Sequence, residues 1–123
     1  MKGLRTTIYH VNEMQKAKEW YSKVFGIQPY FDEPFYVGFE IEGFELGLYI
    51  SENNTSNTSK GVVSYWAVDD VEAEYRRLIE LGAEEHEKPV NVGGELMVAT
   101  VLDPFGNPIG IIYNPYFKYK GTQ

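Results

Sequence analysis

The hydrophobic and polar positions along the chain predict one structural unit that occurs twice. Each unit begins with a short apolar run that ends in valine, at Val11 in the first unit and Val68 in the second. Apolar residues then recur at helical spacing, and Gly26 and Gly82 follow as helix stops. After each helix the pattern changes to period two, which is typical of strands. The predicted unit is therefore a strand, a helix and two or three further strands.

The start of each predicted helix supports the repeat. Superposing the two valines matches Asn12 with Asp69, and both residue types are good helix caps. Gln15 and Glu72 follow three residues later, so both units are predicted to carry a capping box.

Turn residues mark the strand pair that closes each unit. In the first unit "YVGFEI" and "FELGLYI" are separated by Glu42 and Gly43, and in the second "ELMVATVL" and "PIGIIYN" flank an Asp-Pro-Phe-Gly-Asn reversal. Weaker patterns predict short strands near "IQPYFDE" and "AEEHEKPV", and the glycines of "NVGGEL" predict a turn. Helices on one face of mainly antiparallel strands give an α+β fold class, in which the other face of the sheet stays free. Two such units side by side would make the free faces a concave trough.

We interpret the chain as a single domain, residues 1–123, which is long enough to fold without disulfides. The first module is predicted to span residues 1–50 and the second 61–117. The polar stretch "SENNTSNTSK", residues 51–60, is the predicted linker between them, and residues 118–123 are a tail.

Charge and composition exclude several kinds of partner. With 18 acidic and 11 basic residues the net charge is −7, so we expect no binding to nucleic acid. The absence of cysteine removes disulfides and thiolate metal sites. No apolar run reaches the length of a signal peptide core or a membrane span, so we expect a cytoplasmic protein with no membrane partner. Aromatic residues make up 15% of the chain, which indicates that some line a ligand site.

Strand alternation places candidate residues of the first module on the free face of the sheet. Thr6, Ile8 and His10 share one side of the first strand, opposite Val11, which leads into the helix. His10 is therefore a candidate ligand contact, although a rim or dimer-contact residue is the favoured interpretation. His86, in a charged loop or edge strand, is interpreted as a solvated residue.

Glu45 is the notable carboxylate. The apolar residues of "FELGLYI" alternate to one face, so Glu45 and Tyr49 point to the free face. A carboxylate there has three open roles: metal ligand, base or solvated side chain. In the second module the same alternation gives Tyr65 and Gly110. Glycine is unusual inside a strand, and it marks a bulge, a close approach or a lost side chain. No complete catalytic set is present in the sequence.

The order and doubling of these motifs resemble the glyoxalase/bleomycin resistance/dioxygenase superfamily, also called vicinal oxygen chelate proteins. "VNEMQKAKEWYSKVFG" is similar to the family's first strand-to-helix signature, and "DPFGNPIGI" is similar to its closing hairpin. The resemblance covers residues 4–115. It implies two βαβββ modules that form a curved mixed-sheet trough with the helices on the outer face.

The resemblance also implies where a metal would lie. Metal-dependent members bind a divalent ion with one residue from each of four strands, commonly His or Gln and Glu. By motif these positions are Thr6, Glu45, Val63 and Gly110, of which only Glu45 is a strong ligand. Gly110 thus stands where a second glutamate is expected. We predict no metal site and no cofactor, with a divalent metal as the alternative.

The sequence therefore predicts a metal-independent small-molecule binding protein rather than an enzyme, and Glu45 is the one catalytic candidate. We expect the ligand to be aromatic or cationic and the protein to be a homodimer. The predicted lining residues are Thr6, His10, Glu45, Tyr49, Tyr65 and Gly110. Two alternatives stay open: a divalent-metal-dependent lyase, isomerase or dioxygenase that uses Glu45, and a protein-interaction module that uses the aromatic tail Tyr113–Tyr119.

Overall fold

The chain divides into two compact units. Unit 1 is Met1–Lys60 with Pro104–Asn107, and unit 2 is Gly61–Asp103 with Pro108–Gln123. The computed structural model describes residues 1–2, 4–51 and 62–116. All of the predicted linker except Ser51, the predicted tail and the end of the aromatic segment after Tyr116 lie outside the described residues.

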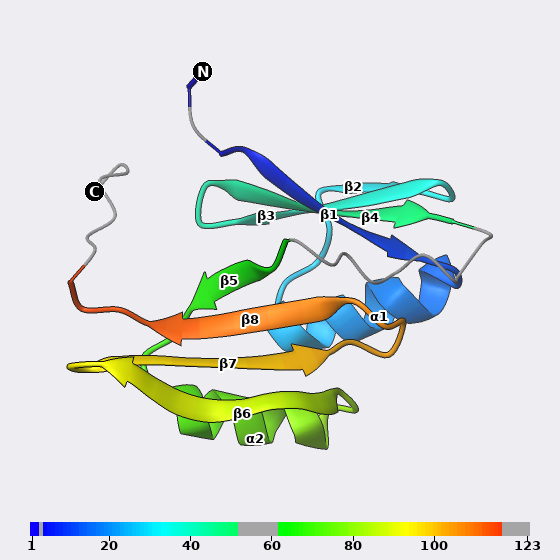
Figure 1. The fold of residues 1–123 in the computed structure, drawn as a ribbon. Helices are drawn as coiled ribbons and strands as arrows, with labels where there is room; N and C mark the ends of the chain where they lie inside the picture. Colours follow the sequence, from blue (N-terminus) through cyan, green and yellow to red (C-terminus); the bar gives the residue numbers. More distant parts are fainter. Residues whose placement is uncertain (3, 52–61, 117–123) are drawn as a thin grey trace. The chain divides into compact units, whose positions relative to one another are not determined.

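Unit 1 is a four-stranded sheet with one helix (Figure 1). Its elements are β1 (Thr6–Val11), α1 (Met14–Phe25), β2 (Phe31–Glu33), β3 (Tyr36–Ile41) and β4 (Phe44–Ile50). The strand order is β1-β4-β3-β2, in which β1 runs parallel to β4 and the other neighbours are antiparallel. Between the parallel strands β1 and β4 the chain forms α1, β2 and β3, which supplies the long connection that a parallel pair needs.

Unit 2 repeats this arrangement. Its elements are β5 (Ser64–Ala67), α2 (Val71–Glu80), β6 (Glu84–Gly93), β7 (Leu96–Leu102) and β8 (Pro108–Tyr113). The strand order β5-β8-β7-β6 has the same pattern of parallel and antiparallel pairs (Figure 1). The predicted α+β class and the predicted pair of βαβββ modules are confirmed. Neither described helix has the length and apolar content needed to cross a membrane.

One apolar face of each sheet packs on its helix. Leu46 and Leu48 are fully buried, whereas Tyr49 next to them remains exposed, as period-two alternation predicts. Burial of large apolar side chains stabilises such a layer by about 1.5–3 kcal/mol each. The buried apolar residues of unit 1 are Tyr9, Val11, Ala17, Tyr21, Val37, Phe39, Leu46 and Leu48. Those of unit 2 are Val71, Tyr75, Leu78, Ala83, Ala99, Val101, Ile109 and Ile111.

Both helices begin one residue later than the sequence predicted. The N-cap residues are Glu13 and Asp70, not Asn12 and Asp69. Asp70 Oδ1 accepts a hydrogen bond from the Ala73 backbone N–H at 3.1 Å, whereas Glu13 makes no side-chain cap bond. The predicted capping boxes are therefore wrong. Each helix is preceded by two adjacent acidic or amide residues, and in the folded chain the second of the two is the N-cap residue.

Candidate functional site

The helix-free face of unit 1 is organised around Glu45. Strand pairing sets Glu45 of β4 directly beside Thr6 of β1. Thr6 Oγ1 donates a hydrogen bond to Glu45 Oε1 at 2.8 Å, and the Tyr30 hydroxyl donates to Oε2 at 2.5 Å. Each carboxylate oxygen thus has a hydroxyl donor, which fixes the orientation of the carboxylate. We refer to Thr6, Tyr30, Tyr36 and Glu45 as the Glu45 site.

Two glycines allow these side chains to lie close to the sheet. Gly38 and Gly47 are opposite each other on β3 and β4. A methyl group at Gly38 would lie 2.9 Å from Glu45 Oε2 and 3.1 Å from Tyr30 Cε1. A methyl group at Gly47 would overlap the Tyr36 hydroxyl. The carboxylate and both tyrosine rings therefore require strand positions without a side chain.

Hydrogen bonding favours the ionised form of Glu45. The bond from Tyr30 is the largest influence on the pKa of Glu45 and lowers it; bonds from Thr6 and Tyr36 act in the same direction, and desolvation opposes them. The hydrogen bond to Glu45 is also the main cause of the raised pKa of Tyr30, whereas desolvation is the main cause of the raised pKa of Tyr36. At neutral pH the site presents a negative carboxylate beside two neutral phenols.

Further aromatic rings extend along the same face. The Phe31 ring lies 6.4 Å from the Tyr30 ring and 6.1 Å from the Tyr36 ring, between centroids. Toward the other end of β1 and β4, His10 and Tyr49 are paired, and their rings meet edge to face at 5.6 Å. Tyr30 is 63% exposed and Tyr49 is 46% exposed. An ionised carboxylate among exposed aromatic faces is an arrangement that suits organic cations.

In unit 2 the predicted residues Tyr65 and Gly110 are also paired, across β5 and β8. A methyl group at Gly110 would lie 2.5 Å from Tyr65 Cδ1 and 2.7 Å from Cε1. The ring of Tyr65 therefore occupies the space next to Gly110. Close approach of a side chain explains this glycine within its strand.

The register of pairing shows which positions of the two units are equivalent. The repeat matches Ile8 with Tyr65, and their parallel partners are Gly47 and Gly110. Gly47 is therefore the counterpart of Gly110. Glu45 and Gly110, which the resemblance assigned to matching ligand positions, are not equivalent, because Glu45 lies two residues earlier in its strand.

The residues at the expected metal positions do not fit a divalent ion. The Thr6 hydroxyl donates to Glu45, the Val63 side chain has no ligating atom, and Gly110 has no side chain. Within residues 1–2, 4–51 and 62–116, no three His, Asp or Glu side chains gather where they could hold a metal. A single carboxylate does not supply the three or four ligands that such an ion needs.

Sequence reasoning missed three participants. Tyr30 and Tyr36 lie in "YFDEPFY", whose density of aromatic residues was the available signal. His86 is exposed on the edge strand β6, in line with its interpretation as a solvated residue of a loop or edge strand, but its Nδ1 also lies 2.8 Å from Thr100 Oγ1, a contact that the sequence did not indicate.

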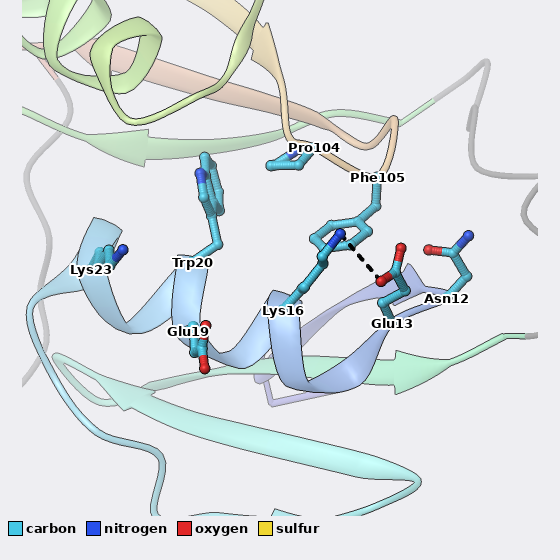
Figure 2. Close-up of a pocket in the computed structure, with 8 residues that line it drawn as sticks. All are labelled: Asn12, Glu13, Lys16, Glu19, Trp20, Lys23, Pro104 and Phe105. Carbon is cyan, nitrogen blue, oxygen red and sulfur yellow. Dashed lines mark ion pairs between the residues drawn. The ribbon is translucent and has the colours of Figure 1, made fainter.

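A pocket of about 430 Å³ lies beside α1 (Figure 2), and none of its lining residues belongs to the Glu45 site. Pro104 and Phe105 line one side of it, and Asn107, in the same short segment, donates from Nδ2 to the His10 backbone carbonyl at 3.0 Å. Lys16 and Glu13 form an ion pair across its surface at 3.4 Å (Figure 2). Two lysines and two glutamates line the pocket, so its formal charges cancel and favour neither anions nor cations. The lining residues are Asn12, Glu13, Lys16, Glu19, Trp20, Lys23, Pro104 and Phe105.

Comparison with known proteins gives a consistent result. The family model described as Glyoxalase/Bleomycin resistance protein/Dioxygenase superfamily matches residues 3–111. No curated protein matches the chain.

Solved structures with the same fold include a glyoxalase-related enzyme from Fulvimarina pelagi, at 18% identity and a TM-score of 0.75, covering 94% of this chain and 90% of that one. A lactoylglutathione lyase from Agrobacterium tumefaciens is 17% identical, with a TM-score of 0.73 and coverage of 97% and 98%. A glyoxalase/bleomycin resistance protein from Albidiferax ferrireducens T118 is 21% identical, with a TM-score of 0.71 and coverage of 90% and 98%. At these identities the likeness concerns the fold.

Proposed function

We propose, from the premise that this chain belongs to the glyoxalase/bleomycin resistance protein/dioxygenase superfamily, that it binds a small aromatic cation at the Glu45 site without a metal. The observation that carries the proposal is the ionised carboxylate of Glu45, held by Thr6 and Tyr30 among exposed aromatic rings. The proposal includes no cofactor and no catalytic step. It also keeps the expectation of a cytoplasmic homodimer, for which sedimentation velocity of the untagged protein is the check on the oligomeric state.

Charge supports a cationic ligand. The chain has a net charge of −7, so a positive ligand is attracted before it makes contact. At the site, Glu45 supplies the counter-charge, and the lone pairs of its carboxylate that are not used by Thr6, Tyr30 and Tyr36 remain able to accept hydrogen bonds. The faces of neighbouring aromatic rings stabilise a cation by about 0.5–2 kcal/mol more.

The spacing of the rings supports a flat ligand of moderate size. Thr6 and His10 lie on the same side of β1, four residues apart, which corresponds to about 13 Å along a strand. A ligand that contacts Glu45 beside Thr6 and also the Tyr49 ring beside His10 therefore has the length of about three fused aromatic rings. N-methylacridinium has this length and a fixed positive charge.

The test is a calorimetric titration with N-methylacridinium and, as the uncharged comparison, acridine at neutral pH. The protein should bind the cation more tightly than acridine. Glu45→Gln should weaken binding of the cation about tenfold, which corresponds to about 1.4 kcal/mol, and should leave acridine binding unchanged.

Glu40→Gln is the matched control. Glu40 faces Glu45 across the β3–β4 ladder, but its carboxylate accepts from the Gly43 backbone N–H at 2.7 Å and, within the described part of the chain, makes no hydrogen bond to the tyrosines. This variant removes the same charge from the same face and should lower the affinity much less than Glu45→Gln. Recognition by Glu45 would be contradicted if Glu40→Gln and Glu45→Gln lost the same affinity for N-methylacridinium. It would also be contradicted if the wild-type protein bound N-methylacridinium and acridine equally well.

A further inference from the structure

A second polar cluster lies on the helix-free face of unit 2. In β7, Ala99 and Val101 are buried with the apolar core, so Thr100 between them points to the opposite face. Thr100 is paired with Gly110, and Gly110 is paired with Tyr65. The Thr100 hydroxyl and the Tyr65 ring therefore lie on one row of this face, two strands apart.

An irregularity in β6 brings two consecutive side chains to Thr100. Glu85 is opposite Val101 and Glu87 is opposite Thr100, so His86 is an extra residue in the ladder. Such a bulge re-aims the side chains at its site, which in a regular strand would alternate between the two faces. His86 Nδ1 lies 2.8 Å from Thr100 Oγ1, and Thr100 Oγ1 lies 3.1 Å from Glu87 Oε1.

The hydrogen bonds determine which nitrogen of His86 carries the proton. An ionised glutamate only accepts, so the single hydroxyl proton of Thr100 is donated to Glu87. The Thr100 oxygen must then accept from His86, which places a hydrogen on Nδ1. A neutral imidazole has one N–H, and therefore Nε2 keeps a free lone pair. Because Thr100 is only 1% exposed, water does not compete for its hydroxyl.

The lone pair of Nε2 is available to a ligand. His86 is an exposed residue of β6, and the described chain contains no hydrogen-bond partner for Nε2. Tyr65 is 46% exposed and its ring lies over Gly110 of β8, the strand next to Thr100. Neighbouring strands lie about 5 Å apart, so Nε2 of His86 and the Tyr65 ring are separated by about 5–10 Å, a gap that one aromatic ring fills.

We propose that unit 2 carries a ligand site of its own, in which the Glu87–Thr100–His86 chain presents Nε2 of His86 as a hydrogen-bond acceptor and Tyr65 provides an apolar wall. Its ligand class is a small aromatic compound with an O–H or N–H donor, such as a phenol. This site differs from the Glu45 site in chemistry, because it recognises a donor hydrogen rather than a positive charge.

The first test is the tautomer of His86, from long-range ¹H–¹⁵N NMR spectra of the whole protein at about pH 8.5, above the ordinary histidine range. The chain has only two histidines, so His10 serves as the internal comparison. The proposal requires a protonated Nδ1 and an unprotonated Nε2 at His86. The opposite tautomer at His86 would overturn it, and this measurement needs no variant.

The second test uses matched glutamate variants and phenol as the probe. Glu87→Ala frees the Thr100 hydroxyl to donate to Nδ1, so the proton of His86 should move to Nε2. Glu85→Ala removes the same charge from the same strand and should leave the tautomer unchanged. Phenol should shift the Nε2 resonance of His86 in wild type and in Glu85→Ala but not in Glu87→Ala. The proposal is refuted if Glu87→Ala leaves the tautomer of His86 unchanged, or if phenol shifts the ring nitrogen resonances of His10 as much as those of His86.

Discussion

Gly110→Ala tests the close approach between Gly110 and the ring of Tyr65. The new methyl group would lie 2.5, 2.7 and 2.9 Å from ring atoms Cδ1, Cε1 and Cγ, so the ring has to move about 1 Å to reach an ordinary contact of about 3.5–4 Å. Tyr65 is 46% exposed, so roughly half of its surface is buried. If a fully buried tyrosine hides about 200 Å², losing this contact exposes at most about 100 Å².

That area corresponds to an upper limit of about 2.5 kcal/mol, and a ring forced off its preferred rotamer costs about 0.5–1.5 kcal/mol. We therefore expect Gly110→Ala to lower the free energy of unfolding by about 1–2 kcal/mol. In a Tyr65→Ala background no ring lies over the glycine. Since Gly110 is not among the glycines with positive φ, alanine should then stabilise the protein by about 0.4–1 kcal/mol.

The assay is urea unfolding followed by circular dichroism for the four proteins of this cycle. The expected coupling between positions 65 and 110 is about 2 kcal/mol. If Gly110→Ala has the same effect in both backgrounds, within the roughly 0.5 kcal/mol expected of independent sites, the reasoning is refuted.

Three further predictions concern the helix caps and the Glu45 site. Asp70→Ala should lower the free energy of unfolding by about 1 kcal/mol and Glu13→Ala by no more than a few tenths, because only Asp70 makes a cap bond; thermal melts compare the two. Tyr30→Phe should raise the pKa of Glu45, measured by carboxyl NMR. The folded pKa of Glu45 is depressed, so its contribution to stability is present above the unfolded pKa and is lost as pH falls through the folded pKa; Tyr30→Phe should reduce that acid-induced loss. Gly47→Ala should cost about 1–3 kcal/mol in chemical unfolding by displacing the tyrosine hydroxyl above it, and an unchanged stability would contradict that contact.

Periodicity was sufficient to predict the architecture, because burial of one sheet face and one helix face controls it. The alternation in "FELGLYI" correctly assigned Leu46 and Leu48 to the core and Tyr49 to the opposite face. The end of α1 at Gly26 was also predictable from the sequence, because Gly26, the residue after α1, adopts a left-handed backbone conformation with φ 68°.

The contacts of the candidate site were not readable from the sequence. Tyr30 and Glu45 meet through two strand pairings, and no local pattern encodes that contact. A register shift of two residues keeps every side chain on its own face of the sheet and leaves the hydrophobic pattern unchanged, so periodicity did not distinguish Glu45 from Gly47 as the counterpart of Gly110. The approach of His86 to Thr100 depends on a bulge, and a bulge breaks the periodicity on which the prediction rested.

The central claim is ligand recognition without a metal. The direct measurement is metal content by mass spectrometry of untagged protein, with melting curves and N-methylacridinium titrations before and after chelation. We predict less than one divalent ion per chain. We also predict that chelation changes neither the melting temperature nor the affinity for N-methylacridinium. One divalent ion per chain, whose removal lowers the melting temperature or abolishes binding, would contradict the claim.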